Sequence, residues 1–504
     1  MATLKDRLIA LLSVVACIWQ GQVVPACAVT AQPASPPLLP SSGAPLPTGA
    51  PVPTGAPGPA AEPASRFVNP ADATSRVDDL TKQILLKEIE LGRFNVHFKM
   101  EAARQGRWKG WRYFLSQESN AALTDAGLIV GIKERMGKIH RPKNLNPHTL
   151  QHGLVPQAVG QTIGAAGSAW EFLVNEYHEV RAHQLGFSPG AAKKHVMQLR
   201  DEIDRLLAER DALVQIESAA PLLTTHAAVD SAEGRVLRDI RDLNLVEYSQ
   251  WHIGARRLLA FQQSLYLLDI AKNTTGAVGN WVAKHSIHVK RRTWNAPAGM
   301  LTTISGALII LTPLLSRATG MLVGSLHQHL IAGCTKDCLT RDVAQLDADL
   351  LKLQQLCQSP ECAREQVASS VAHLAQYKTH DENFMTQYHQ RTKEAHAGLL
   401  AASENIFTGA FVGGTKVATG VNLTVAGVKY THSARITNSL IGSGTIAYCV
   451  GTSWALLDNP RIQLKREWVN YKLGKQHQLP GQMLKDRLNR LDQMEAAIKG
   501  AGSS

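Results

Sequence analysis

Residues 299–325 read GMLTTISGALIILTPLLSRATGMLVGS, and the interpretation of the whole chain begins with this stretch. Its uninterrupted apolar part, 299–316, is about long enough to cross most of the ~30 Å hydrocarbon layer of a membrane. Pro313 would kink such a helix, which membranes tolerate, and the charge of Arg317 would reach toward one interface. The sequence therefore predicts a transmembrane helix over 298–325. The alternative is a buried helix of a soluble bundle.

Two further apolar stretches lie within 406–457: IFTGAFVGGTKVATGVNLTVAGV and ITNSLIGSGTIAYCVGTSWALL. Both are rich in small residues, and Gly409 and Gly413 form a GxxxG pair, which is typical of helices that approach closely in a membrane. We predict a small-residue-rich transmembrane helix pair over 406–457. Lys416 is an intramembrane charge candidate, like Arg317, and such charges are candidates for function.

The N-terminal region has the composition of an export leader followed by a linker. Residues 1–28 contain basic residues, a short apolar run and the small-x-small sequence ACA, which is the pattern of a signal peptide. An uncleaved anchor and lipidation at Cys17 are alternatives. Residues 29–65 are rich in Pro, Ala and Gly, which predicts a disordered, polyproline-like linker. The predicted location is the cell membrane of a bacterial-type envelope, with exported portions.

The residues between linker and first span carry helical periodicity. One segment has a heptad seam formed by Val196, Leu199, Ile203, Leu206 and Leu213. Arg210 occupies the missing position of this seam. The seam predicts a helical hairpin or bundle within the chain, or a self-associating coiled coil. The predicted fold class is therefore mainly α: a multi-helix membrane protein with a soluble, bundle-like or coiled-coil-like helical domain over 66–297.

Four cysteines follow the first predicted span: Cys334, Cys338, Cys357 and Cys362. Apolar residues from Val343 onward recur at helical spacing and Ser359-Pro360 forces a turn, so 326–405 is predicted to be a cysteine-containing helical hairpin. A helix between the second and third cysteine would hold them roughly 28 Å apart, beyond disulfide reach. The local pairs Cys334–Cys338 and Cys357–Cys362 are therefore the disulfide candidates. A four-cysteine zinc site and free thiols are alternatives.

The net charge of +12 is unevenly distributed. A basic helical tail over 458–504 follows the second apolar region, whereas 326–405 is acidic. Basic residues at 290–292 favour a cytoplasmic location for the flank before the first span, although an export leader would place that flank outside. The two signals agree if 155–174, a mildly apolar stretch, also crosses. The expected partners are the lipid bilayer and other envelope proteins or a second copy, and no nucleic acid is expected.

The sequence contains no pattern that predicts catalysis. His178 and His183 are five residues apart, rather than the four that place two metal ligands on one helical face. His327 and His329 beside the first span favour an interfacial pair over a metal site. We therefore expect no catalytic, metal or cofactor-binding residue. The predicted function is a non-enzymatic anchor or assembly component; the alternatives are a transporter or pore subunit and a membrane-bound enzyme without a recognisable motif.

Overall fold

The computed structural model describes residues 70–102, 107–138, 144–219, 224–359, 368–476 and 478–500. The predicted leader (1–28) and linker (29–65) lie outside these residues, and so does Cys362. The described residues are almost entirely helical and include no strand, which confirms the mainly α fold class.

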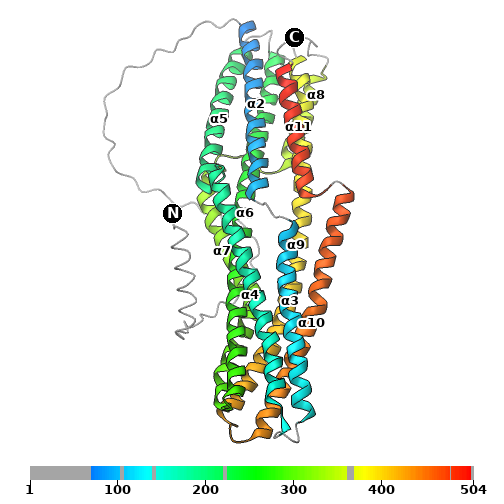
Figure 1. Cartoon of the computed structure of the whole chain (residues 1–504). Helices are drawn as coiled ribbons and strands as arrows, with labels where there is room; N and C mark the ends of the chain where they lie inside the picture. Colours follow the sequence, from blue (N-terminus) through cyan, green and yellow to red (C-terminus); the bar gives the residue numbers. More distant parts are fainter. Residues whose placement is uncertain are drawn as a thin grey trace, which may run out of the picture. The chain divides into compact units, whose positions relative to one another are not determined.

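The helices are long, and several exceed 30 residues (Figure 1). In chain order they are α2 (Pro70–Ala102), α3 (Arg107–Gly137), α4 (Pro147–Gln184), α5 (Pro189–Ser218), α6 (Thr224–His288), α7 (Asn295–Ile331), α8 (Val343–Cys357), α9 (Ala368–Val428), α10 (Ala434–Lys475) and α11 (Pro480–Gly500). Short 3-10 turns, η2 (Arg292–Trp294) and η3 (Ala332–Cys334), flank α7.

Two helices are long enough to take part in two different bundles. α6 has 65 residues and α9 has 61, so each is roughly 90–100 Å long. Near one end they pack with α2, α5, α8 and α11, which we call the polar half; near the other they pack with α3, α4, α7 and α10, which we call the apolar half (Figure 1). Both halves belong to one compact unit, Asn69–Ser504.

The polar half has an ordinary hydrophobic core. The heptad residues Val196, Leu199 and Ile203 are at most 3% exposed, and they pack in a cluster that also contains residues of α2, α6, α8, α9 and α11. The predicted seam is thus used for packing within the chain, against α2 and α6. Burial of apolar side chains accounts for the stability of this half in water.

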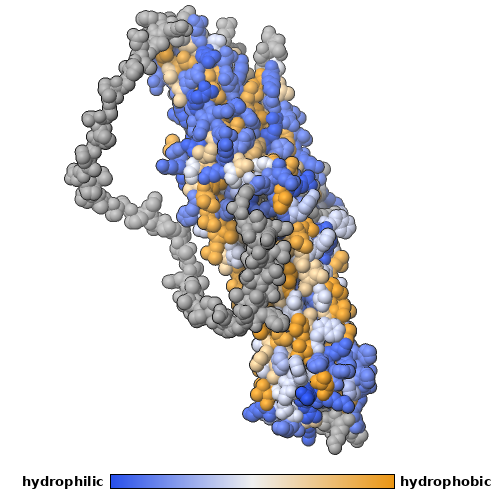
Figure 2. All heavy atoms as spheres, turned by 60° about the vertical axis from the view of Figure 1, so that its left-hand side comes forward, coloured by the Kyte–Doolittle hydropathy of each residue, from blue (hydrophilic) through white to orange (hydrophobic). Residues whose placement is uncertain are grey.

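The helices of the apolar half have the opposite arrangement. The buried residues of α7 are Asn295, Ala298, Gly299, Ser305, Gly306, Thr312, Ser316, Gly320, Gly324 and Ile331. Its exposed residues include Met300, Ile304, Leu311, Leu314, Leu315, Met321 and Leu322. Small and polar residues therefore face inward while large apolar residues face outward. Figure 2 shows the result: hydrophobic residues gather over the lower part of the molecule, between hydrophilic regions.

Two helical segments of the described chain are long and apolar enough to cross a membrane. They lie within Arg292–Cys334 and Ala434–Gly500. In the 18-residue apolar stretch of each segment, only 33% and 39% of the residues are buried. The first contains the predicted span 298–325, and the second contains the later helix of the predicted pair. The earlier helix of that pair, with Lys416, forms the end of α9.

The sequence predicts a helix that runs from the second cysteine to the third, residues 338–357, but the helix in the structure is shorter. Helix α8 begins only after Asp342, whose side chain accepts a hydrogen bond from the backbone N–H of Ala344. Cys334 ends the turn η3 and Cys338 lies in the following non-helical segment. The helix begins late because Asp342 caps it, a strong local signal for a helix N-terminus.

Candidate functional site

The apolar half encloses a cavity of about 80 Å³ that contains Lys416 and is lined by both polar and apolar residues. Residues of α3, α4, α6, α7, α9 and α10 line it, so all six helices of this half contribute. The side chain of Lys416 is 3% exposed, and its ammonium group lies 5.3 Å from the centroid of the Tyr448 ring. The intramembrane charge candidate Lys416 therefore points into the bundle.

Gly276 and Gln161 form the part of the cavity next to the ammonium group. A Cβ atom added to Gly276 would come within 2.9 Å of Lys416 Nζ and 2.5 Å of Gln161 Oε1. A side chain at this position would therefore displace the ends of Gln161 and Lys416, and glycine leaves both where they are. Among the described residues, no carboxylate forms an ion pair with Lys416. A buried ammonium without a carboxylate is costly unless polar groups or an anion compensate it.

Arg317, the other charge candidate, is half-buried on α7 and does not line this cavity. A second cation that does line it is Arg135, which donates a hydrogen bond of 3.0 Å to Asn438 Oδ1. Arg135 belongs to the end of α3, a helix for which the sequence predicts no span. Sequence reasoning therefore missed it.

Other polar groups lie between the helices of the apolar half, Asp269 buried and Asp125 half-buried. Asp125 accepts hydrogen bonds from Thr452 (2.7 Å) and Ser453 (3.1 Å) of α10. Asp269 forms an ion pair with Lys272 and accepts a hydrogen bond from Tyr113. These contacts join α3 to α10 and to α6, and they place ionisable groups inside a bundle whose outer surface is apolar.

The polar half contains a buried ionic network centred on Arg210. The guanidinium is 0% exposed and donates hydrogen bonds to Thr81 Oγ1 (2.8 Å), to the backbone oxygen of Asp230 (2.8 Å) and to Glu233 Oε2 (2.9 Å). Glu233 also accepts a hydrogen bond of 2.8 Å from Tyr377 of α9. Burial alone would raise the pKa of Glu233, but the hydrogen bond with a histidine of α9 and the arginine charge outweigh it and lower that pKa to about 2.

Next to this network lie Glu217, His226 and Asp230, a group of potential metal ligands. Glu217 belongs to the last turn of α5, and the other two are four residues apart in the first turns of α6. All three are buried, and their ligand atoms lie within 4.8 Å of one another. The Asp230 carboxylate, together with that of Glu217, raises the pKa of His226 to about 10.

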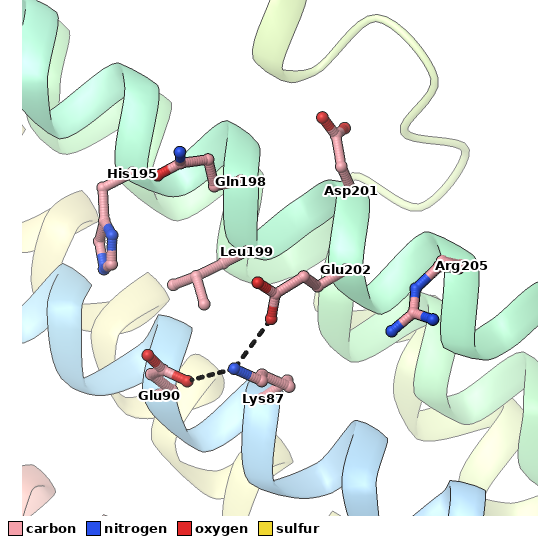
Figure 3. Close-up of a pocket in the computed structure, with 8 residues that line it drawn as sticks. All are labelled: Lys87, Glu90, His195, Gln198, Leu199, Asp201, Glu202 and Arg205. Carbon is pink, nitrogen blue, oxygen red and sulfur yellow. Dashed lines mark hydrogen bonds and ion pairs between the residues drawn. The ribbon is translucent and has the colours of Figure 1, made fainter.

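A surface pocket of about 480 Å³ lies between α2 and α5 (Figure 3). Lys87 projects into it and forms ion pairs with Glu90 (3.1 Å) and Glu202 (2.8 Å). Both carboxylates are thus already compensated by the lysine, and the groups are partly exposed. We assign no chemistry to this pocket, because exposed ion pairs of this kind are common on helix surfaces.

The four-cysteine zinc site, an alternative to the predicted disulfides, includes Cys362 and is therefore not tested by the described residues. Cys334 and Cys338 are buried free thiols, so the predicted Cys334–Cys338 disulfide is not formed in the structure. Both belong to the hydrophobic core of the polar half, where burial raises the pKa of Cys338 to about 12. Cys357 is half-buried, and since Cys362 lies outside the described residues, the pair Cys357–Cys362 stays a prediction.

The histidines considered from sequence occupy ordinary positions. His327 lies 3.2 Å from His252 of α6, measured between ring nitrogens, and these rings help to join α7 to α6. His183 is exposed at the end of α4. The sequence does not reveal the cluster of Glu217, His226 and Asp230, because its members belong to two different helices and only the tertiary structure brings them together.

The fold and these sites define a mainly α protein with two helices long and apolar enough to cross a membrane. No protein-family profile, curated protein or solved structure matches the chain. The functional conclusion therefore comes from its own residues.

Proposed function

We propose that this chain is a non-enzymatic membrane anchor or assembly component, whose apolar half lies in lipid and whose polar half lies outside it. The single observation that carries the proposal is the reversed placement of side chains in the apolar half. In water, each fully exposed Leu or Ile would forfeit about 1.5–3 kcal/mol of burial energy. In lipid the same side chains are solvated, while small inward residues allow close helix packing.

The reversal is not confined to α7. In α4 the buried positions include Gly160, Gly164 and Ser168, while Trp170 and Leu173 are 59% and 54% exposed. α10 follows the same rule: its buried residues include Thr437, Asn438, Gly442, Gly444, Thr445, Gly451, Thr452 and Asp458. Its exposed residues include Ile446, Val450, Trp454 and Leu457. Three helices with the same pattern support a common lipid-facing surface.

Aromatic and lysine side chains pair near both ends of this surface. Near the end of α6, Lys284 Nζ lies 4.7 Å from the Trp281 ring centroid. Near the end of α10, Lys472 Nζ lies 5.4 Å from the Trp468 ring centroid. Arg292, beside the α6–α7 turn, donates a hydrogen bond to the backbone oxygen of Thr431, just before α10 begins. The start of α10 therefore lies near that turn and its end lies far from it. Amphipathic aromatic and long basic side chains suit the two head-group regions of a bilayer.

The proposal can be tested by placing a charge on the supposed lipid-facing surface. Leu311 of α7 is 43% exposed, and Leu339 of the polar half is 87% exposed. A lysine near the middle of a span costs about 2.5–3.5 kcal/mol on insertion scales, whereas a lysine at a water-exposed position costs little. We expect Leu311→Lys to reduce the carbonate-resistant membrane fraction and Leu339→Lys to leave it unchanged. Equal recovery of both variants in the soluble fraction, as folded protein, would refute the proposal.

The partners on the outside remain as predicted from sequence: other envelope proteins or a second copy of the chain. The envelope type is likewise a proposal that rests on the leader alone. In-cell crosslinking through lysines of the polar half tests whether the chain has such a partner. A specific crosslinked neighbour or dimer supports assembly, and a monomer under all conditions contradicts it.

One observation favours a transporter or pore subunit as the second candidate: Lys416 is buried beside a cavity and pairs with no carboxylate among the residues that the structure describes. Intramembrane charges that face a cavity are typical of substrate or ion pathways. Lys416→Met should then abolish a solute or ion flux in reconstituted vesicles. Lys429→Met is the matched control, because Lys429 is an exposed residue of the turn after α9. Identical fluxes for both variants and the unmodified protein would remove this candidate.

A further inference from the structure

The ends of α5 and α6 bring together Glu217, His226 and Asp230 in the polar half. These side chains are 0%, 6% and 1% exposed. We propose that the three residues bind a divalent transition-metal ion, such as zinc, that fastens the start of α6 to the end of α5. This inference is independent of the proposed membrane function.

The distances between the three side chains suit a shared ion. His226 Nδ1 is 2.6 Å from Asp230 Oδ2 and 3.7 Å from Glu217 Oε2. Metal–ligand bonds of about 2.0–2.2 Å in tetrahedral geometry place neighbouring ligand atoms roughly 3.3–3.6 Å apart. The observed distances lie on both sides of that value. Small side-chain rotations would therefore complete the three-ligand geometry.

The ligand atoms are not used in well-formed hydrogen bonds. Both oxygens of Glu217, Nδ1 of His226 and Oδ2 of Asp230 are buried without a regular hydrogen bond, and they meet in the ion pairs of His226 with Asp230 and Glu217. Burying such groups unsatisfied is costly, and natural structures rarely contain several together. The other oxygen of Asp230, Oδ1, lies 3.6 Å from Arg210 Nη2. The arginine thus occupies one side of the carboxylate and leaves Oδ2 directed toward the proposed site.

The charges around the site favour a cation. Four carboxylates approach one another here: Glu217, Asp230, Glu233 and Asp78. Among the described residues, the guanidinium of Arg210 contacts two of these carboxylates, Asp230 and Glu233. A neutral imidazole and a divalent ion would offset much of this excess negative charge. Protonation of His226 is the competing way to supply positive charge.

The ligand set identifies the class of ion. One imidazole nitrogen with two carboxylate oxygens suits zinc and neighbouring first-row divalent ions, whereas magnesium and calcium prefer oxygen ligands alone. His226 and Asp230 are four residues apart, so both face the same side of α6. Glu217 supplies the third ligand from the preceding helix. A metal there would bridge α5 and α6, and its role would be structural.

The experiment uses the full chain, purified in detergent, stripped with a chelator and dialysed. Cobalt(II) serves as the first probe, because its visible absorption reports the ligand field, and zinc serves as the second. We expect near-stoichiometric zinc by elemental analysis, a cobalt band that zinc displaces, and a rise in Tm of roughly 2–5 °C at 100-fold excess over Kd.

Two variants and a matched control separate metal binding from folding. His226→Asn and Asp230→Asn should weaken zinc binding by at least about 100-fold and remove the cobalt band. His380→Asn is the control, because His380 is another buried histidine of the polar half but contacts none of the three ligands. This control should retain full metal binding even if its Tm is lower.

The outcomes decide between a metal and a proton. If the stripped wild-type chain is folded and shows neither a cobalt band nor a zinc-dependent Tm, the proposal is overturned and protonated His226 occupies the cluster. If His226→Asn and His380→Asn bind zinc equally, these residues do not form the site. Loss of binding in the two ligand variants alone supports it.

Discussion

At the scale of single residues, Arg210 links a sequence anomaly to a structural cause. A charged residue in an apolar heptad position is unusual, and the sequence marks it for that reason. The structure gives it partners from α2 and α6, which are 129 and 23 residues away for Thr81 and Glu233. A buried arginine is retained only where such partners exist, since an unpaired charge in the core costs several kcal/mol. Sequence can identify the position but not the partners.

Glu88 of α2 supports a prediction about pH. Its side chain is 0% exposed and accepts a hydrogen bond of 3.0 Å from Asn244, and burial raises its pKa to about 8. Since the folded-state pKa lies above the ordinary value of 4.5, the stability linked to this group is complete below pH ~4.5. It is lost as the pH rises through about 8. We expect Glu88→Gln to raise Tm at pH 9 and to leave it nearly unchanged at pH 5.

The size of the effect follows from about 1.4 kcal/mol per pKa unit, so the upper limit is a few kcal/mol. Glu90→Gln is the control, because Glu90 lies on the same helix, is partly exposed and pairs with Lys87. That variant should show no comparable pH-dependent gain. A Tm difference between the wild type and Glu88→Gln that stays constant from pH 5 to 9 would contradict the raised pKa of Glu88.

At the scale of helices, α7 and α9 pack through glycines on both sides. A Cβ on Gly413 would lie 2.8 Å from the backbone oxygen of Gly306, and a Cβ on Gly420 would lie 2.7 Å from that of Gly299. Backbone atoms cannot move aside as a flexible side chain can, so these positions require the absence of a side chain. The small-residue pattern predicted close packing, and the structure identifies α7 as the helix that Gly413 approaches.

Neighbouring glycines of α9 allow a direct test of this packing. Gly413→Ala places a methyl group against the α7 backbone, and we expect it to destabilise the protein by about 1–3 kcal/mol. Gly414→Ala meets nothing within 4 Å, and alanine should favour the helix there by up to about 1 kcal/mol. The two substitutions should therefore shift Tm in opposite directions, as measured by thermal unfolding in detergent. A shift in the same direction for both would show that α7 does not lie against Gly413.

At the scale of the whole molecule, the helices of the apolar half explain a conflict between topology signals. The turns at 289–294 and 429–433 are adjacent, joined by the 2.9 Å hydrogen bond from Arg292 to the backbone oxygen of Thr431. This end of the apolar half is basic, which favours the cytoplasmic side. The acidic 326–405 segment begins at the other end of α7. If all six helices of this half cross, an exported polar half and a cytoplasmic basic end are compatible.

This arrangement predicts the accessibility of two introduced cysteines. His432 is exposed in the turn between α9 and α10, and Leu339 is exposed in the polar half. In sealed spheroplasts, a membrane-impermeant maleimide should label Leu339→Cys at once and His432→Cys only after permeabilisation, with the unmodified chain as background. Equal labelling of both variants before permeabilisation would contradict the six-crossing arrangement.

The sequence by itself determined the helical fold class, the position of the long apolar helix α7, the heptad seam of α5 and the identity of Lys416 as a charge within an apolar region. These features follow from local periodicity and composition, which can be recognised from residues that are neighbours in the sequence. Only the tertiary structure decided that Gly276 and Gln161 lie beside Lys416, that Arg210 meets Glu233, and that Glu217 meets His226. Such contacts join residues of different helices, and their geometry depends on how whole helices pack rather than on any local pattern.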